Sequence, residues 1–261
     1  MIKLIATDID GTLLKEGSDS INPEYFEVIS RLKEKGIIFA VASGRQFASI
    51  YNLFYPVKDD IVFVAENGGY VSGRRIDMTE IIMDKEIAKT IIKMGRKLPN
   101  CFLTVSAKDK MYLEACDETF WHLLVDGYHN TMEKVNNLLE LEIDIIKVSI
   151  YKENGVSDIA NQIIADWKDK IHVTVAGDIW IDFMDYGADK GKAVKSIQQQ
   201  MNILPEETMV FGDNLNDMGM IKSAKESYAV GNARSEIREA AKYITDTNVN
   251  DGVLKILKKL L

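Results

Sequence analysis

The stretch from Leu4 to Thr12 constrains this chain more than any other. The apolar run Leu4-Ile5-Ala6 comes first, and such a run is typical of a buried parallel strand. Asp8 and Asp10 follow two residues apart, so on an extended backbone both carboxylates lean to the same side. Gly11 comes next and lets the chain leave the strand in a conformation that other residues resist. The pattern predicts a strand that ends at two neighbouring acids.

Two carboxylates at the carboxyl end of a buried strand stand where open α/β sheets bind ligands. Close carboxylates repel each other unless a cation or a shared proton relieves them. The stretch therefore indicates a metal, a shifted pKa, or both, at Asp8 and Asp10. Its plainer interpretation is a turn followed by a helix cap, because Asp, Gly and Thr are ordinary turn residues.

Length and composition limit the classes of function. The chain has 261 residues, of which 46% are hydrophobic, and a net charge of −8, which suits one large or two modest globular domains. An acidic chain is a poor candidate for non-specific binding to nucleic acid or to an anionic membrane. No signal peptide is evident, and no apolar run approaches the ~20 residues that span a bilayer. We therefore expect a cytoplasmic protein in which Cys101 and Cys116 are structural thiols.

Strand and helix patterns alternate in the first and last parts of the chain. Pro23 to Lys35 is predicted to be a helix, and Ile37 to Ala42 a second buried strand, which together with the first strand makes a βαβ unit. The same alternation returns after Gly187. This predicts an α/β fold with a Rossmann-like, doubly wound core around a parallel sheet.

The middle of the chain has a different pattern. It combines predicted helices at Lys85–Leu98 and Val156–Trp167 with pairs of short strands that look like hairpins. Helices with hairpins favour an α+β unit with a largely antiparallel sheet. We expect a discontinuous core, residues 1–81 and 187–261, interrupted by an inserted α+β cap domain, residues 82–186.

Four short polar stretches fall at the ends of predicted core strands or helices. They are Asp8 to Thr12, Ser43-Gly44-Arg45, Lys190, and Gly212 to Asp217. Because strand carboxyl ends share one edge of a parallel sheet, these groups can converge. Asp8, Asp213 and Asp217 offer hard oxygen ligands suited to Mg²⁺. Ser43 and Lys190 can hold a phosphate, as can the N–H groups of glycine turns.

This ordered set, DxDGT, then SGR, then a lone lysine, then GDxxxD, resembles the haloacid dehalogenase superfamily of phosphotransferases over nearly all of the chain. The position of the insert is similar to the large α+β (type IIB) cap of the Cof-like branch. Further stretches match that branch: Asn67-Gly68, Lys190-Gly191, Asn232-Ala233 and Asp251-Gly252-Val253.

The resemblance implies a role for each matching residue. Asp8 would be the nucleophile that forms an aspartyl-phosphate, and Asp10 would protonate the leaving alcohol and then activate water. The carboxylates of Asp8 and Asp213 and the main-chain carbonyl of Asp10 would hold Mg²⁺. Asp217 would support the metal, directly or through water. The phosphoryl group would be held by Ser43, Gly44, Lys190, Asn216 and the N–H of Ile9.

The implied activity is a Mg²⁺-dependent phosphatase for small phosphorylated metabolites, with sugar phosphates as the expected class. The cap would close over the leaving group, exclude water from the first step and choose the substrate, and a monomer is expected. Two departures from the branch concern the substrate. Asp185 to Asp189 stands where related chains often carry a Pro and a Ser, and Asp182 stands where a glutamate is common.

Three alternatives stay open. A phosphomutase would use the same aspartyl-phosphate. A receiver-like signalling domain also gathers acids, Mg²⁺ and a lysine at one sheet edge, although it does not explain the insert. A non-catalytic protein that binds a phosphorylated ligand would keep the fold, although the intact Asp8 and Asp10 argue against it.

Other polar or aromatic residues have plainer interpretations. Asn214 is expected to cap the following helix, and Arg45 to be an ion-pair partner or a helix-start residue. Trp180 is expected to pack inside the insert rather than to support the leaving group. The histidines lie in the insert without metal-ligand spacing and are expected to be surface or cap residues: His122, His129 and His172.

Overall fold

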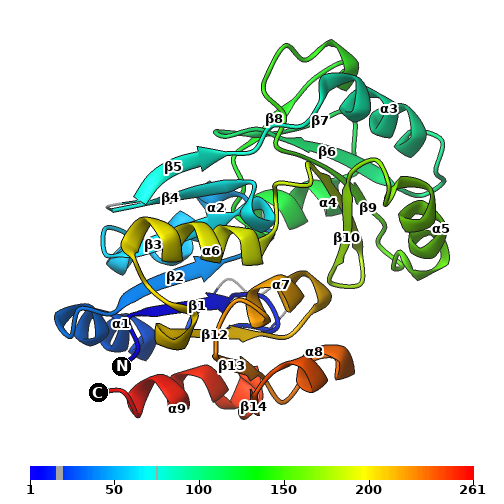
Figure 1. The fold of residues 1–261 in the computed structure, drawn as a ribbon. Helices are drawn as coiled ribbons and strands as arrows, with labels where there is room; N and C mark the ends of the chain where they lie inside the picture. The colour runs from blue at the N-terminus through cyan, green and yellow to red at the C-terminus, as the bar shows by residue number, and fades with distance from the viewer. Residues whose placement is uncertain (16–19, 75) are drawn as a thin grey trace.

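The computed structural model describes residues 1–15, 20–74 and 76–261 (Figure 1). The chain folds into two units, and each unit contains its own β-sheet. The strands of the first sheet, in spatial order, are Tyr243–Ile244 (β14), Glu226–Ala229 (β13), Thr208–Gly212 (β12), Leu4–Asp8 (β1), Ile38–Ala42 (β2), Ile61–Ala65 (β3), Tyr70–Gly73 (β4) and Ile76–Glu80 (β5).

The strand β1 lies in the middle of this core sheet and pairs in parallel with β12 and β2. All five of its residues are buried, as the apolar run predicts. Parallel pairing continues from β14 to β3, and the hairpin of β4 and β5 extends the sheet with antiparallel strands. The predicted α/β core around a parallel sheet is confirmed.

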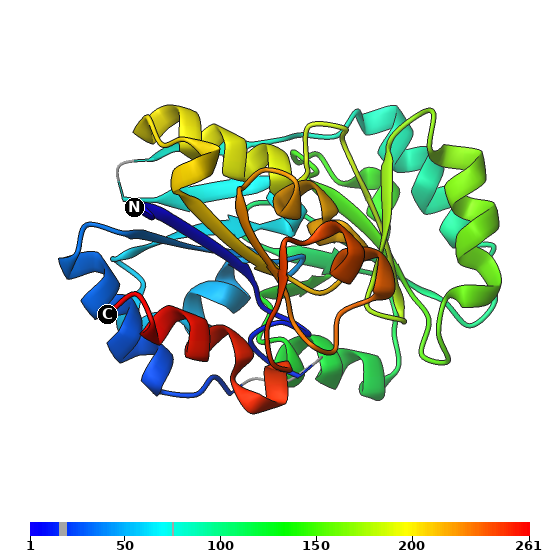
Figure 2. The same ribbon diagram turned by 60° about the horizontal axis from the view of Figure 1, so that its bottom comes forward.

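Helices cover both faces of the core sheet (Figure 2). They are Glu24–Glu34 (α1), Phe47–Leu53 (α2), Lys190–Met201 (α6), Met218–Ile221 (α7), Ser235–Ala240 (α8) and Gly252–Lys258 (α9). The helix α6 contacts α7 on one face, whereas α1 contacts α9 on the other. This two-sided cover is why the core strands are apolar along their whole length.

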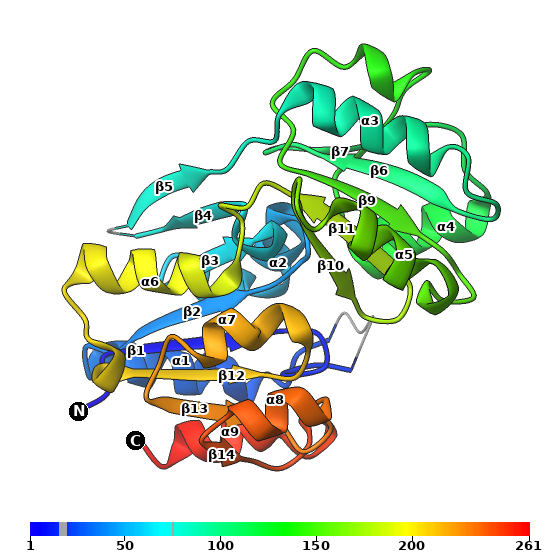
Figure 3. The same cartoon turned by 45° about the vertical axis from the view of Figure 1, so that its right-hand side comes forward.

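The second unit is an α+β layer (Figure 3). Its strands, in spatial order, are His172–Ala176 (β10), Trp180–Met184 (β11), Lys147–Tyr151 (β9), Phe102–Ser106 (β6), Met111–Leu113 (β7) and Met132–Lys134 (β8). Neighbours run antiparallel except β7 and β8, which run parallel. The helices Lys85–Gly95 (α3) and Ser157–Trp167 (α5) pack on one face of this sheet. Glu118–His122 (α4) packs on the other.

The sequence patterns miss the elements between residues 115 and 144. The structure places α4, a π-helical turn at Leu123–Gly127, β8 and a 3₁₀ turn at Leu138–Glu140 there. Elements of three to five residues carry too little periodicity to be recognised, because tertiary contacts rather than propensity hold them. Similarly, the helix that Asn214 is expected to cap is a 3₁₀ turn, Leu215–Asp217, followed by the short α7.

Two links join the units, at residues 81–84 and 185–189, where the chain passes from one sheet to the other. We propose the predicted limits, 1–81 with 187–261 and 82–186, as the two domains. Among the described helices, none combines the length and the apolar character needed to cross a membrane.

Candidate active site

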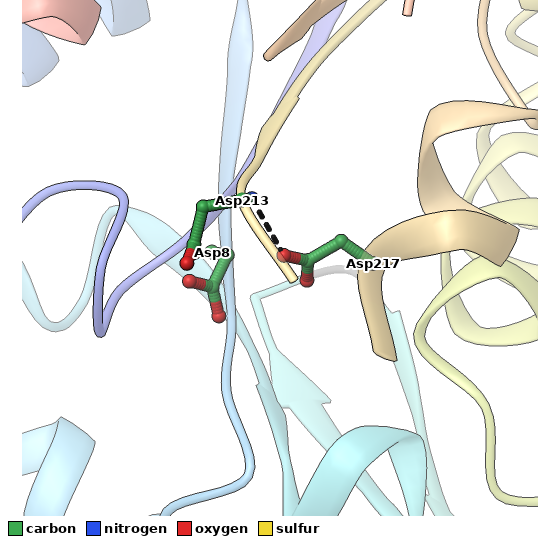
Figure 4. A group of neighbouring side chains, drawn as sticks. All are labelled: Asp8, Asp213 and Asp217. Atoms are coloured by element: carbon green, nitrogen blue, oxygen red, sulfur yellow. Dashed lines mark hydrogen bonds between the residues drawn. The ribbon is translucent and has the colours of Figure 1, made fainter. Parts of the chain in front are cut away.

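Three aspartates bring their carboxylates together at the carboxyl end of the core sheet (Figure 4). Asp8 ends β1, Asp213 follows β12, and Asp217 ends the 3₁₀ turn Leu215–Asp217. One oxygen atom from each lies within 4.8 Å of the other two. The parallel pairing of β1 with β12 explains the convergence, because it puts both strand ends at the same edge.

Lys190 lies between two of these carboxylates. It is the first residue of α6, its side chain is buried, and its Nζ donates to Asp8 Oδ1 at 2.5 Å and to Asp217 Oδ1 at 2.7 Å. The other oxygen of Asp217 accepts the N–H groups of Asp213 at 2.9 Å and Asn214 at 3.1 Å. Both oxygens of Asp217 are therefore engaged within the protein, so Asp217 anchors the lysine and the loop.

The cluster concentrates negative charge away from water. Burial, followed by Asp217, raises the pKa of Asp8 well above its usual range. The same two causes raise the pKa of Asp213 to about 6. Burial lowers the pKa of Lys190, but Asp217 and Asp8 outweigh it and raise that pKa, which keeps the lysine charged. Three hard carboxylates with one cationic partner fit a divalent cation such as Mg²⁺.

The turn after β1 is shaped around Asp213. Thr12 Oγ1 donates to Asp213 Oδ1 at 2.7 Å. Gly11 has a φ of 82°, and a Cβ atom on it would stand 2.3 Å from Asp213 Oδ2. Both the backbone conformation and the close approach therefore require glycine.

Asp10 does not join the carboxylate cluster but forms a bidentate ion pair with Arg45. The guanidinium of Arg45 also lies 5.3 Å from the centroid of the Tyr128 ring. The backbone N–H of Arg45 donates to Ser43 Oγ at 3.1 Å. This agrees with the expected ion-pair role of Arg45, and its partner is the proposed acid and base.

The remaining predicted phosphate-binding residues divide into two kinds. Ser43, Gly44 and Asn216 line a cavity beside the carboxylates. Ile9 is fully buried in the core and stands outside the lining of this cavity. Asn214 accepts the N–H of Leu215 at 2.8 Å, as expected for a cap, and it also lines the cavity.

The sequence patterns miss a second buried charge cluster. Lys147, at the start of β9, donates to the carbonyl oxygen of Gly44 at 2.6 Å. Its Nζ also lies 2.6 Å from Glu66 Oε2 and 3.5 Å from Asp182 Oδ2. Asp182 in turn accepts from Ser149 Oγ at 2.7 Å. Lys147 and Asp182 belong to the insert, whereas Gly44 and Glu66 belong to the core. The cluster therefore links the two units by hydrogen bonds and ion pairs.

The core side of this cluster has unusual backbone geometry. Glu66 and Asn67 are both buried and have φ values of 50° and 54°, in the left-handed region. Asn67 donates to Asp182 Oδ2 at 3.0 Å and accepts from Asn216 Nδ2 at 3.0 Å. Surrounding contacts must hold such a conformation in place, because it is disfavoured for residues with a side chain. The position of Lys147 inside the largely apolar stretch from Ile145 to Ile150 is the one sequence signal that could have pointed to it.

Both units line the cavity, which is partly open to solvent. Asp8, Asp10 and the Ser43–Arg45 stretch line it from the core, and Thr104, Lys147 and Trp180 are among the residues that line it from the insert. Trp180 packs in the insert as expected, with its ring centroid 5.0 Å from that of Tyr151, and it also lines the cavity.

The three histidines do not belong to the cavity lining. His122 pairs with Asp126, and the ring of His172 contacts the carbonyl oxygen of Ala188 at 2.7 Å. The thiols of Cys101 and Cys116 are not joined to each other.

Comparison with known proteins agrees with this geometry. Residues 5–257 match the family described as haloacid dehalogenase-like hydrolase. The 5-amino-6-(5-phospho-D-ribitylamino)uracil phosphatase YbjI of Escherichia coli (strain K12) is 29% identical over 100% of this chain and 96% of its own. YcsE of Bacillus subtilis (strain 168), a phosphatase of the same name, is 28% identical over 98% of this chain and 95% of its own.

A crystal structure of a Eubacterium rectale protein is 39% identical, covers 100% of this chain and 99% of its own, and superposes with a TM-score of 0.85. The family match spans nearly the whole chain, and the core sheet carries the expected acids at its carboxyl edge. The chain therefore belongs to the haloacid dehalogenase-like hydrolases, in their Cof-like branch, and is a phosphoric monoester hydrolase.

Proposed function

We propose that this protein is a Mg²⁺-dependent phosphatase that hydrolyses small phosphorylated metabolites, with sugar phosphates as the substrate class, through an aspartyl-phosphate on Asp8. The observation that carries the proposal is the position of Asp8. It ends the central strand, faces the cavity, and has one carboxylate oxygen bonded to a buried lysine. Asp10 lines the same cavity two residues further on.

In the first step, a carboxylate oxygen of Asp8 attacks phosphorus, and the bond from phosphorus to the leaving oxygen breaks. Asp10 gives its proton to that oxygen, so an alcohol leaves. In the second step, Asp10 takes a proton from a water molecule as the water oxygen attacks phosphorus, and the bond between phosphorus and the Asp8 oxygen breaks. Phosphate leaves, and the Asp8 carboxylate is restored.

The charged groups around Asp8 support this sequence. Lys190 stands beside the oxygen that would carry the phosphoryl group and would neutralise part of its charge. Ser43, the N–H groups of Gly44 and Ile9, and Asn216 would contact the phosphoryl oxygens.

The metal site follows from the same groups. Asp8, Asp213 and the main-chain carbonyl of Asp10 would hold Mg²⁺, and Asp217 would support it through Lys190 and the loop. When bound, Mg²⁺ supplies positive charge that stabilises the phosphoryl group during transfer.

The insert supplies a wall over the reacting groups, which supports the exclusion of water during the first step. That wall comes from the same chain, which supports a monomer as the working unit. The names of YbjI and YcsE add 5-amino-6-(5-phospho-D-ribitylamino)uracil to the candidate substrates.

The test is phosphate release from sugar phosphates, nucleotides, pyridoxal phosphate, 5-amino-6-(5-phospho-D-ribitylamino)uracil and 4-nitrophenyl phosphate, with Mg²⁺ and with EDTA. We expect turnover that EDTA abolishes and Mg²⁺ restores. Asp8→Asn should keep the fold and lose hydrolysis. Activity above a few per cent in that variant, roughly the background of alternative nucleophiles, would remove Asp8 from the nucleophile role. Transfer of phosphate between two positions of a sugar, without release, would indicate a phosphomutase.

A further inference from the structure

Two stretches singled out by their sequence have no part in the proposed chemistry. Asn232-Ala233 lies between β13 and α8, and Asp251-Gly252-Val253 lies where α9 begins. They belong to the loops that follow β13 and β14, which run parallel to β12 and so end at the same edge of the core sheet. Asp8 and Asp213 lie at that edge. The two loops are therefore neighbours of the loops that carry the acids.

Two asparagines from these loops hold the turn that follows β1. Asn232 Nδ2 donates to the carbonyl oxygen of Gly11 at 2.7 Å, and Asn248 Nδ2 donates to the carbonyl oxygen of Leu14 at 2.8 Å. The two residues are also joined to each other, because Asn232 Oδ1 accepts the backbone N–H of Asn248 at 2.9 Å. We call Asn232 and Asn248 the asparagine pair.

The loop that carries Asn232 also holds Asp213. The backbone N–H of Arg234 donates to the carbonyl oxygen of Asp213 at 2.9 Å. From the turn after β1, Thr12 Oγ1 donates to Asp213 Oδ1 at 2.7 Å. Three loops are therefore hydrogen-bonded into one unit around Asp213, whose carboxylate lies close to that of Asp8 (Figure 4).

The second stretch, Asp251-Gly252-Val253, places Asn248. The N–H of Gly252 donates to the carbonyl oxygen of Thr247 at 3.0 Å. A Cβ atom on Gly252 would stand 2.0 Å from the carbonyl oxygen of Asp246, so a side chain has no room there. The glycine therefore lets the chain fold back tightly enough for Asn248 to reach Leu14.

The asparagine pair acts on the peptide group between Asp10 and Gly11. This group is planar, so the direction of the Gly11 N–H fixes the direction of the Asp10 carbonyl. The Gly11 N–H donates at 2.8 Å to the carbonyl oxygen of Leu14, which is the atom that Asn248 holds. Asn232 holds the next carbonyl group of the turn, that of Gly11. The pair therefore sets the direction of the Asp10 carbonyl through the turn.

We propose that Asn232 and Asn248 are positioning residues that hold the Asp10 carbonyl and Asp213 in place as ligands of Mg²⁺. Neither asparagine lines the cavity that contains Asp8 and Asp10, so neither acts through contact with a substrate there. Groups that orient metal ligands by hydrogen bonds typically change metal affinity about 10- to 100-fold. The inference rests on the proposed function and deepens its metal site.

The experiment measures Mg²⁺ binding without substrate. The protein is stripped of metal with EDTA and dialysed, and its thermal midpoint is followed as Mg²⁺ is added. The rise in the midpoint gives the dissociation constant, because a ligand that binds only the folded state stabilises it by an amount set by that constant. In Asn232→Ala and in Asn248→Ala we expect the dissociation constant of Mg²⁺ to rise about tenfold.

The matched control is Asn250→Ala, which removes a hydrogen bond to Asp246 Oδ1 within the same loop as Asn248. It should leave the dissociation constant unchanged. The midpoint of the metal-free protein reports any structural role separately. A lower metal-free midpoint with an unchanged dissociation constant in either variant of the asparagine pair would overturn the proposal, as would an equal rise of the constant in Asn250→Ala.

Failure of this inference can be told from failure of the proposed function. If Mg²⁺ raises the midpoint of the wild type and of both variants of the asparagine pair equally, only the role of the pair is refuted. If Mg²⁺ leaves the wild-type midpoint unchanged, or the wild type releases phosphate in EDTA, the proposed metal site fails first.

Discussion

Arg45 holds both carboxylate oxygens of Asp10 at once, with Nε 2.8 Å from Oδ2 and Nη2 2.5 Å from Oδ1. The arginine is itself fixed, because its side chain is buried and its guanidinium lies beside the Tyr128 ring. A planar guanidinium group that donates to both oxygens sets the orientation of the carboxylate. Arg45 therefore orients the proposed acid and base.

Replacing Arg45 with lysine keeps the positive charge but removes the planar pair of N–H donors. For Arg45→Lys we expect kcat to fall about 10- to 100-fold, because a misplaced catalytic group loses that much. KM should change less. Steady-state kinetics with 4-nitrophenyl phosphate measures both. Arg31→Lys, on the exposed side of α1, is the control, and an equal effect there would contradict the orienting role.

Two glycines in the left-handed region give a matched pair of variants. Gly11→Ala brings a methyl group against the Asp213 carboxylate, whereas a Cβ atom on Gly36, with φ of 76°, meets nothing within 4 Å. Both variants carry the backbone strain of about 1–2 kcal/mol. Only Gly11→Ala should also lower kcat and weaken the activation by Mg²⁺. Titration of activity with Mg²⁺ checks this, and similar curves for both variants would refute it.

Removal of Lys147 should destabilise the protein strongly. Lys147→Met leaves Glu66 and Asp182 buried without their cation, and breaking such a pair costs about 3–5 kcal/mol. Adding Glu66→Gln should recover part of that loss, because it removes one of the unpaired charges. Urea denaturation measures the free energy of unfolding.

The control for this cluster is Lys152→Met, which removes a pair with the exposed carboxylate of Asp158. Exposed pairs contribute little, so its midpoint in urea should barely move. Equal shifts of the urea midpoint for Lys147→Met and Lys152→Met would show that the buried cluster contributes no more to stability than an exposed ion pair does.

The raised pKa values predict how metal-free protein responds to pH. Asp213 has a pKa of about 6 when folded and an ordinary value of 3.8. Between these values the folded state binds more protons at this carboxyl group than the unfolded state does, so its contribution to stability is full below this range and is lost as the pH rises through about 6. Burial raises the pKa values of Asp8 and Glu66 in the same direction.

Thermal unfolding in EDTA across this pH range measures the effect. Mg²⁺ should raise the midpoint more at neutral pH than in acid, because protons compete for its ligands. Asp213→Asn should reduce the slope of stability against pH. An identical slope of stability against pH in Asp213→Asn and the metal-free wild type would contradict the assignment.

Much of the core could be predicted because its signals are local. The apolar run Leu4-Ile5-Ala6 predicts a strand, and the two acids that follow it, Asp8 and Asp10, mark its end. The order of the motifs along the chain predicts which strand ends lie together. The structure brings Asp8, Asp213, Asp217 and Lys190 together as that reasoning expects. Polar residues that end a strand can be recognised because the residues directly before them in the sequence form that strand.

The second charge cluster could not be predicted in this way. Lys147, Glu66 and Asp182 are far apart in the sequence, and only the apolar neighbours of Lys147 indicate that one of them is buried. Their contact depends on how the insert sits on the core, which is a property of the packed units.

The strand β9 and the residue before it have a consequence for how the protein unfolds. Ile146 packs into the hydrophobic cluster of the core, while Val148 packs into that of the insert. Lys147 lies between them and binds the core at Gly44 and Glu66. Heat that melts one cluster therefore loosens the other, and calorimetry should record one cooperative transition for a protein with two sheets.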